Sequence, residues 1–134
     1  MNDASVGAGA RPAEPEVVVA PTKRKLRRMD RLLKIGFRRF GYWEVVDDRL
    51  RYRLDEHARH SNCLYAFIAD AEILYVGKTT ATLIKRMNGY AAEGNPRSTN
   101  GRSNKRIRRF LMDGKAVEIY VLPDEGLVLS LIHI

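Results

Sequence analysis

The chain has 134 residues, of which 45% are apolar and 30% charged, a composition that suits one globular domain with a tail. It holds no run of about 18 apolar residues, so the sequence predicts neither a membrane-spanning helix nor a membrane partner. The first residues lack the basic-then-apolar order of a secretory signal. The single cysteine, Cys63, excludes an internal disulfide and a cysteine-based zinc cluster. We therefore expect a cytoplasmic protein.

The charge balance favours a polyanionic partner. Twenty-four Lys and Arg residues face sixteen Asp and Glu residues, which gives a net charge of +8 and a pI near 9.9. Such an excess favours nucleic acid first and an acidic membrane surface second, although a basic surface can also serve solubility alone. Most of the cations are arginines, whose planar guanidinium suits phosphate better than an ammonium group does.

The N-terminal end is predicted to form a tail and then a basic helix. Residues 1–21 are rich in Ala, Gly, Pro and Glu and show no period, so we expect a disordered tail. Thr22 is a plausible N-cap and Gly36 a plausible C-cap. The apolar residues between them recur at helical spacing: Leu26, Met29, Leu32 and Leu33. This amphipathic helix either follows nucleic-acid phosphates or packs with a solvated basic face.

Strands are expected to follow the basic helix. Residues 37–54 alternate apolar and polar side chains around Asp47-Asp48, which predicts a hairpin or paired strands. A polar linker comes next, in which His57 and His60 have no cysteine or carboxylate at ligand spacing, so we interpret them as solvated. Helix and strands together make an N-terminal arm over 22–61.

The remaining residues predict a strand-strand-helix-helix-strand unit. Two short apolar strands, 63–69 and 73–76, form a central hairpin. A helix capped by Thr79 or Thr80 follows, then a polar loop over 94–101, a basic helix that Ser103 begins and Gly114 ends, and a strand over 117–121. We therefore predict an α/β fold, a small domain over 62–128 with a short mixed or antiparallel three-stranded sheet flanked by helices.

Tyrosine, glycine and arginine residues cluster along the central hairpin and its helix. Tyr65 and Tyr75 sit on adjacent strands, Gly77 follows the second, and Arg86 and Tyr90 share one helix face. The segments Cys63-Leu64-Tyr65, Tyr75-Val76-Gly77 and Lys85-Arg86-Met87-Asn88-Gly89-Tyr90 together resemble the GIY-YIG nuclease family. The resemblance covers 62–127, about half of the chain.

The resemblance implies metal-dependent hydrolysis of phosphodiester bonds in DNA. Tyr65 or Tyr75 would act as general base, with the metal or Lys78 lowering the pKa of the phenol. Arg86 would stabilise the pentacoordinate phosphate, because guanidinium stays charged and donates in pairs. Gly77 would let the backbone approach the phosphate. Tyr90 takes a place where members often carry a proton-handling His.

A shared site sets a condition on the central hairpin. Tyr65 and Tyr75 must point to the same face of the sheet, yet a tight two-residue turn at Asp70-Ala71 would pair Tyr65 with Val76 and turn the two tyrosines to opposite faces. The sequence therefore predicts a connection of odd length or a bulge.

The second basic helix is a candidate phosphate-binding element. Polar and cationic residues gather at its N-terminus, where backbone N–H groups favour anions. An alternative is a solvated face around Ile107 and Phe110 for Arg106, Arg108 and Arg109. The predicted DNA-binding residues are Thr99, Asn100, Arg102, Asn104, Lys105 and Arg108.

The sequence departs from the family at its end. Members carry a metal-binding Glu on a helix after the third strand, whereas Glu118 lies on that strand and Glu125 in the following turn. We therefore assign no metal ligand in this chain, expect Mg²⁺ only in a full-length form, and expect no small-molecule cofactor. Residues 129–134 resemble the translation of a sequencing adapter, with a genuine apolar tail as the alternative. The chain as given is then an endonuclease domain that binds DNA and cleaves poorly; the rivals are a non-catalytic nucleic-acid-binding protein on the same scaffold and a basic RNA-associated protein.

Overall fold

The computed structural model describes residues 21–55, 60–92 and 94–123. The predicted tail up to residue 20, the segment 129–134 and His57 lie outside the described residues. Within the described ranges, three helices and five strands follow one another in the order α1 (Lys23–Ile35), β1 (Arg38–Val46), β2 (Arg49–Leu54), β3 (Ser61–Ala69), β4 (Glu72–Thr82), α2 (Leu83–Ala91), α3 (Thr99–Met112) and β5 (Val117–Leu122).

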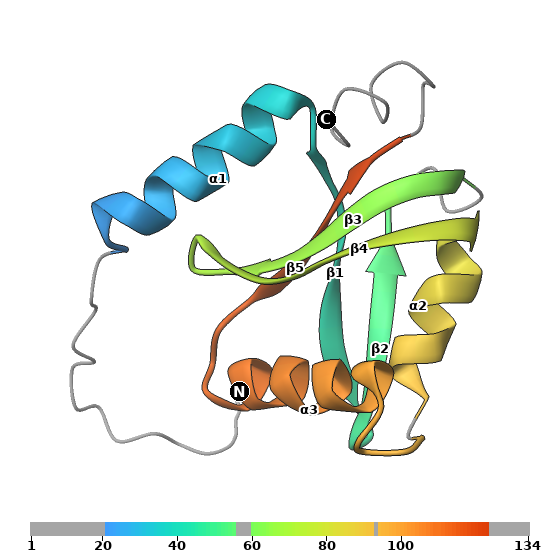
Figure 1. Ribbon diagram of the computed structural model, residues 1–134. Coiled ribbons are helices and arrows are strands. Elements are labelled where there is room, and N and C mark those ends of the chain that lie inside the picture. The colour runs from blue at the N-terminus through green and yellow to red at the C-terminus, as the bar shows by residue number, and fades with distance from the viewer. Residues whose placement is uncertain (1–20, 56–59, 93, 124–134) are drawn as a thin grey trace, which may run out of the picture.

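The strands form one antiparallel sheet of five, in the order β2-β1-β5-β3-β4 (Figure 1). The prediction of a three-stranded sheet is therefore wrong, although the strand-strand-helix-helix-strand order from β3 to β5 is confirmed. The prediction missed the pairing between β1 and β5, in which Gly41 lies opposite Ile119. This pairing brings the β1–β2 hairpin into the same sheet. Val117, Ile119 and Val121 are fully buried, and a strand this apolar needs a partner on both edges.

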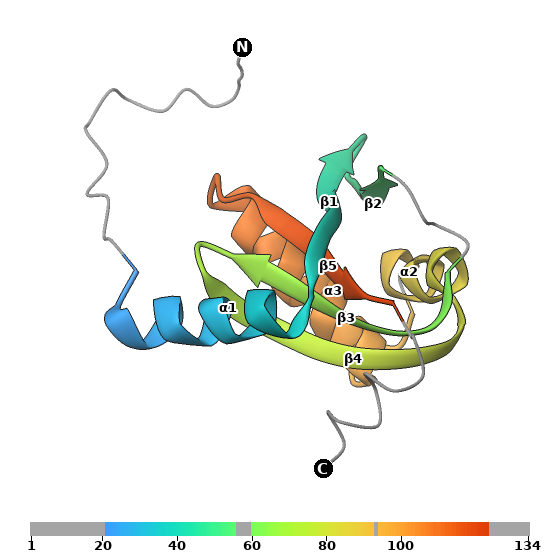
Figure 2. The same cartoon turned by 90° about the horizontal axis from the view of Figure 1, so that it is seen from above.

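Helices cover both faces of the sheet (Figure 2). On one face, α2 and α3 bury a core of Trp43, Tyr65, Phe67, Leu83, Met87, Tyr90, Ile107 and the inward residues of β5. On the other face, Met29 and Leu32 of α1 pack on a smaller cluster that contains Leu64, Ala66 and Ile68. Successive residues of β3 thus face opposite layers, and Tyr65 belongs to the layer of α2 and α3.

The boundaries of α1 follow from its caps. The Thr22 side chain accepts a hydrogen bond from the Lys25 backbone N–H at 3.2 Å, and Gly36 ends the helix with a positive φ of 125°. Both predicted caps are confirmed. The helix buries no residue completely, so its cationic side chains remain on the surface.

The two later helices begin at positions other than those predicted. Strand β4 continues through Thr79 and Thr80, and Thr82 caps α2 by accepting from the Lys85 N–H at 3.2 Å. Ser98 caps α3 through the Gly101 N–H at 3.0 Å, so the last part of the predicted polar loop is helical. Ser and Thr residues recur near both helix starts, so the sequence alone does not single out the residue that caps each helix. Within the described ranges, no helix combines the length and the apolar character that crossing a membrane requires.

Candidate active site

The β3–β4 hairpin carries a bulge that brings the two tyrosines to one face. Its turn is the tight two-residue type, with positive φ at Asp70 and Ala71, and Ala69 pairs with Glu72. The register then shifts: Ile68 pairs with Ile73 but Phe67 with Tyr75, which leaves Leu74 as the extra residue. Tyr65 consequently pairs with Gly77 rather than Val76. The predicted bulge is confirmed, and the rings of Tyr65 and Tyr75 lie 6.2 Å apart.

Gly77 makes room for these two rings. A Cβ at this position would lie 2.5 Å from both Cζ and the hydroxyl oxygen of Tyr65, and 2.7 Å from the Tyr75 ring. These separations are far inside van der Waals contact, so only glycine fits here without displacing a ring. The sequence predicted that Gly77 would admit a phosphate; in the structure, the tyrosine rings fill the space beside it.

Arg86 joins two buried hydroxyl groups. Its Nε donates to the Tyr65 hydroxyl at 2.9 Å, and a terminal nitrogen of its guanidinium donates to the Tyr90 hydroxyl at 3.0 Å. The two hydroxyls lie 2.6 Å apart, so the three groups close a triangle of hydrogen bonds. The guanidinium carbon also lies 4.7 Å from the centre of the Tyr90 ring. We call Tyr65, Arg86 and Tyr90 the tyrosine–arginine triangle.

The triangle combines two buried phenols with a partly exposed cation. Burial raises the pKa of the Tyr65 phenol above its ordinary value, and the hydrogen bonds from Tyr90 and Arg86 offset this only in part. Burial also raises the pKa of Tyr90, and its bond to Tyr65 raises it further. Burial on its own lowers the pKa of Arg86. The hydrogen bond to Tyr65 and the electrostatic attraction to the Tyr65 oxygen outweigh this effect, so the pKa of Arg86 is raised. Both phenols are therefore protonated at neutral pH, beside a permanent positive charge.

Tyr75 lies beside the tyrosine–arginine triangle, whereas Lys78 lies on the other face of the sheet. The Tyr75 ring is half-buried and lies 6.1 Å from the Tyr90 ring, and its hydroxyl has no hydrogen-bond partner within the described part of the chain. Lys78 pairs with Leu64, one residue away from the Tyr65–Gly77 pair. Because side chains alternate along strands, the exposed Lys78 leaves from the opposite face. The hairpin brings Tyr75 to the triangle and does not bring Lys78 there.

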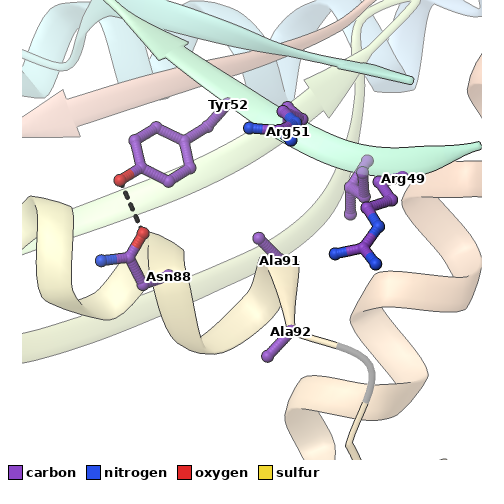
Figure 3. A pocket seen from close by; sticks show the side chains of 7 residues that line it. Arg49, Arg51, Tyr52, Asn88, Ala91 and Ala92 are labelled. Carbon is purple, nitrogen blue, oxygen red and sulfur yellow. Dashed lines mark hydrogen bonds between the residues drawn. The ribbon is translucent and has the colours of Figure 1, made fainter. Parts of the chain in front are cut away.

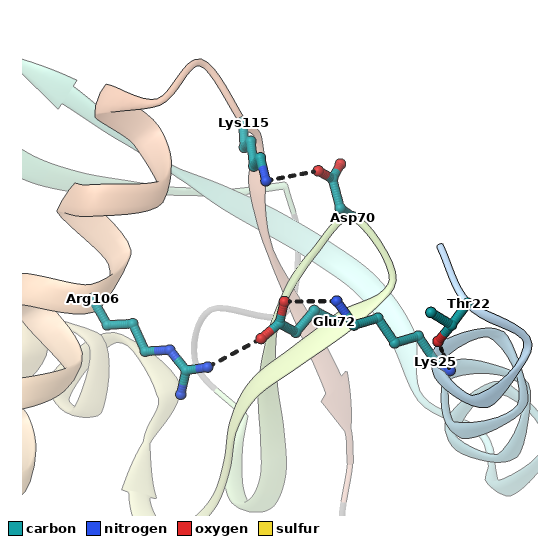
Figure 4. Close-up of polar contacts among 6 residues, drawn as sticks. All are labelled: Thr22, Lys25, Asp70, Glu72, Arg106 and Lys115. Carbon is teal, nitrogen blue, oxygen red and sulfur yellow. Dashed lines mark hydrogen bonds and ion pairs between the residues drawn. The ribbon is translucent and has the colours of Figure 1, made fainter. Parts of the chain in front are cut away.

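An arginine of α3, Arg106, contacts the bulge, and Figure 4 shows its ion pair with Glu72 nearby. One terminal nitrogen of Arg106 donates to the Leu74 carbonyl at 3.1 Å, and the other to Glu72 at 3.2 Å. Glu72 also accepts from Lys25 of α1 at 3.1 Å, so one carboxylate links helices on both faces of the sheet. The bulge residue thereby gains a partner for its carbonyl. The sequence suggested phosphate contact or solvent for Arg106, because no side-chain pattern marks a backbone acceptor.

The predicted DNA-binding residues of α3 divide into two groups. Asn104 is 5% exposed, and its amide donates to the Tyr90 carbonyl at 2.7 Å, so it ties α3 to α2 and is not available to DNA. Arg108 donates to the backbone carbonyl of Asp48 at 3.2 Å. Asn100 is half-buried beside Gly89 of α2. The exposed members are Thr99, Arg102 and Lys105.

The described residues do not form a magnesium site beside the tyrosines. Mg²⁺ prefers carboxylate and water oxygens, and no group of three or more His, Cys, Asp and Glu that could hold a metal occurs in the described ranges. Glu72 is bound to Arg106 and Lys25 at the hairpin end. Glu118 pairs with Ile68 across the sheet, on the face opposite Tyr65, and forms an ion pair with Arg39 at 2.7 Å.

Two solved structures of other proteins share the fold of this chain. A mutant of bacteriophage T4 EndoII superposes with a TM-score of 0.59 and 24% identity, over 70% of this chain and 71% of that one. The restriction endonuclease HPY188I, in complex with product DNA, superposes with a TM-score of 0.55 and 18% identity, over 87% of this chain and 75% of that one. No protein-family profile and no curated protein matches the sequence. The chain therefore has a fold that these endonucleases share.

Proposed function

We propose that this protein is a DNA endonuclease of the GIY-YIG type. The observation that carries the proposal is the tyrosine–arginine triangle with Tyr75 beside it, since a guanidinium held among phenols is suited to bind and polarise one phosphate. Two further observations support it: the fold shared with two endonucleases, and the structure of HPY188I with product DNA, which makes DNA the expected substrate.

Arg86 is the group that binds the scissile phosphate in this proposal. It is half-buried, so one side of its guanidinium is reachable while the other stays bonded to Tyr65 and Tyr90. These bonds fix the orientation of the guanidinium before substrate arrives, which avoids the entropic cost of ordering it later. Its positive charge stabilises the charge that develops on the phosphate oxygens as water attacks phosphorus.

In this proposal the tyrosine side chains orient Arg86 and accept the proton of the attacking water. Tyr65 and Tyr90 are protonated and hydrogen-bonded to each other and to Arg86, so they serve as orienting groups. Tyr75 is the phenol whose hydroxyl remains available to the attacking water. As general base, Tyr75 takes the proton of that water while the new P–O bond forms. The P–O bond to the leaving oxygen breaks, and the proton then passes to that oxygen, which leaves as a hydroxyl group.

Magnesium dependence is a further part of the proposal. In the family, a carboxylate-bound metal supplies charge stabilisation at the phosphate. The described residues do not fit such an ion, so its carboxylate must come from outside them. We propose that cleavage depends on Mg²⁺ and on a glutamate that the described residues do not supply. The 134-residue chain should then bind DNA and cleave it weakly, and an extended protein, in which a glutamate-bearing helix is added after residue 128, should cleave it with Mg²⁺.

A nicking assay tests the function. Supercoiled plasmid is incubated with the extended protein and Mg²⁺, with EDTA and Arg86→Ala as controls. Because removing a charge-stabilising donor typically costs on the order of 100-fold to 1000-fold in rate, Arg86→Ala is expected to lose nearly all nicking while it keeps most of its affinity for DNA through the other phosphate contacts. Equal activity of the Arg86→Ala protein and the unaltered one would defeat the enzyme assignment.

The second candidate is a non-catalytic nucleic-acid-binding protein on the same scaffold. The lack of a carboxylate cluster in the described residues favours it. It predicts binding without nicking in every extended version, with phosphate contacts from the exposed Thr99, Arg102 and Lys105 at the start of α3, together with Asn100. A preference for A-form RNA over duplex DNA at matched salt would identify the RNA-associated rival instead.

A further inference from the structure

A basic groove lies between strand β2 and helix α2 (Figure 3). Its volume is about 620 Å³, and it opens to solvent beside Arg49, Arg51, Tyr52 and Asn88. Ala91 and Ala92 form part of its wall, and small side chains there leave the arginines uncovered. Among the described residues that line it, two are cations and none is acidic. The groove therefore combines positive charge with open space.

The two arginines of the groove differ from the other arginines of the first hairpin. Within the described part of the chain, the guanidinium groups of Arg49 and Arg51 have neither an ion-pair nor a hydrogen-bond partner. Arg53, next in line on the same strand, pairs with Glu44, and Arg39 pairs with both Glu118 and Asp55. An unpaired guanidinium can bind an incoming phosphate without first giving up a carboxylate.

A neutral donor, Asn88 of α2, lines the same groove. The Tyr52 hydroxyl donates to Oδ1 of Asn88 at 2.6 Å, which fixes the amide and leaves its two N–H donors available. Amide and guanidinium donors together are typical of contacts to the nucleic-acid backbone, which carry no sequence information. The composition of the groove thus matches a phosphodiester chain.

The groove and the tyrosine–arginine triangle flank the same helix. Asn88 lies two residues from Arg86 on α2, and residues at this spacing point to different sides of a helix. An α-helix with its side chains is about 10–12 Å across. Since a strand of duplex DNA advances about 3.4 Å per nucleotide, this width corresponds to roughly three nucleotides.

We propose that the groove binds the phosphodiester backbone of duplex DNA about three nucleotides from the phosphate held at Arg86. The inference rests on the proposed nuclease function and names the residues that fix the path of the DNA, Arg49 and Arg51 with Asn88. It assigns a role to the β1–β2 hairpin: the hairpin places two unpaired cations along the substrate strand.

The test is the salt dependence of DNA binding. A fluorescent duplex is titrated with the 134-residue chain in EDTA over about 50–200 mM salt, and the slope of log Kd against log salt is measured. Because each phosphate neutralised contributes about 0.9 to this slope, Arg49→Ala with Arg51→Ala is expected to reduce it by about 1.8. The double lysine variant should keep the slope, because it keeps the charge.

The matched control is Arg39→Ala with Arg53→Ala, which removes the same charge from paired arginines of the same hairpin. A loss of slope that is no larger in the groove variant than in this control would overturn the inference, and thermal unfolding of both variants checks that they fold.

If the groove variant binds like the unaltered chain while Arg86→Ala abolishes nicking in the extended protein, the groove inference fails and the nuclease function stands. If the unaltered chain does not bind duplex DNA at all, both fail.

Discussion

The two β-hairpins share a turn and differ in register. Each closes with two residues of positive φ, Asp47-Asp48 in β1–β2 and Asp70-Ala71 in β3–β4. From its turn, β1–β2 pairs without interruption from Val46–Arg49 to Gly41–Leu54. The β3–β4 hairpin shifts register within three residues of its turn, at Leu74. The same turn geometry is thus followed by regular pairing in β1–β2 and by a bulge in β3–β4, which changes the face on which the later residues of β4 lie.

This difference shows that the turn alone does not decide which face carries the chemistry. Without the bulge, Tyr75 and Gly77 would face the α1 layer, and Tyr65 would face α2 without Tyr75 beside it. The bulge turns Tyr75 toward Tyr65, and Arg106 holds it there through the Leu74 carbonyl. The first hairpin needs no such correction, because its role in the sheet requires only a regular alternation of apolar and exposed residues.

The largest expected effects come from adding one methyl group to each hairpin. In Gly41→Ala the new Cβ would overlap the carbonyl oxygen of Arg53 on the partner strand, so the backbone must move and β1–β2 pairing is lost in part. We expect a loss of about 3 kcal/mol in the free energy of unfolding, at the upper end for overpacking. In Gly77→Ala the atoms nearest to the Cβ belong to the rings of Tyr65 and Tyr75, which can shift more easily than backbone, so the expected loss is about 1–2 kcal/mol.

Activity should rank these two variants in the reverse order. In the extended protein, Gly77→Ala displaces both tyrosines and is expected to reduce nicking on the order of 100-fold, since small misplacements at a reacting centre cost that much. Gly41→Ala, measured well below its melting temperature, should keep most of its nicking. Urea unfolding and plasmid nicking on both variants check the ranking, and equal nicking would show that the tyrosine positions do not matter.

The next prediction compares two cations of the β3–β4 hairpin region, one that contacts the bulge and one that contacts the turn. Arg106 holds the bulge, whereas Lys115 lies 3.6 Å from Asp70 in the turn, and the two cations are similarly exposed, 48% and 45%. Each alanine variant should lose at most about 1 kcal/mol of stability, because exposed ion pairs contribute little. Arg106→Ala should also lower the nicking rate roughly tenfold, or about 1.4 kcal/mol at the transition state, with KM little changed. Partial recovery in Arg106→Lys, and no rate change in Lys115→Ala, would separate positioning from general stability.

The two hairpins also show what sequence alone could predict. Tyr65, Tyr75, Gly77, Arg86 and Tyr90 were identified because they lie within one short stretch whose strand and helix periods fix their relative faces. The requirement for a bulge followed from the same alternation. The five-stranded sheet was missed, because the pairing of Gly41 with Ile119 joins segments far apart in the chain and no local pattern marks it.

Contacts to backbone atoms were the second kind of information that the sequence lacked. Asn104 and Arg106 both looked like surface donors of a basic helix, yet their acceptors are the carbonyls of Tyr90 and Leu74. Every residue has a carbonyl, so a side chain that binds one has no partner to recognise in the sequence. Burial reveals the contact of Asn104, which is 5% exposed, whereas Arg106 is 48% exposed and its contact is recognised only from its position beside the Leu74 carbonyl.

Unfolding at alkaline pH should reveal the two buried phenols of the tyrosine–arginine triangle. The pKa values of Tyr65 and Tyr90 are raised in the folded state, so the stability they contribute is fully present below about pH 10 and is lost as pH rises through the higher folded values. Tyr65→Phe should make the decline of unfolding free energy above about pH 10 shallower. Tyr42→Phe in the first hairpin is the control. Chemical unfolding from neutral pH to about pH 11 measures both slopes, and parallel declines would contradict the buried triangle.

The smallest effect lies in the turns themselves. Asp48 and Ala71 occupy the second position of each turn with φ of 64° and 62°. Asparagine and aspartate tolerate this left-handed conformation, because their side chains bond locally, whereas alanine pays about 1 kcal/mol or more. Glycine removes that cost but adds up to about 1 kcal/mol of unfolded-state entropy, so Ala71→Gly should gain only a few tenths of a kcal/mol, a rise of roughly 2 °C in Tm.

The corresponding change in the first hairpin should not stabilise. Asp48 has little strain to relieve, and its carboxylate lies 3.5 Å from Arg108, so Asp48→Gly loses a contact that Ala71→Gly does not. We therefore expect Tm to stay level or fall by one or two degrees, on the order of a few tenths of a kcal/mol. Calorimetry on the two variants measures the difference. A gain of the same size in both turns would mean that the backbone conformation alone sets their stability, and that neither the aspartate nor its arginine contributes.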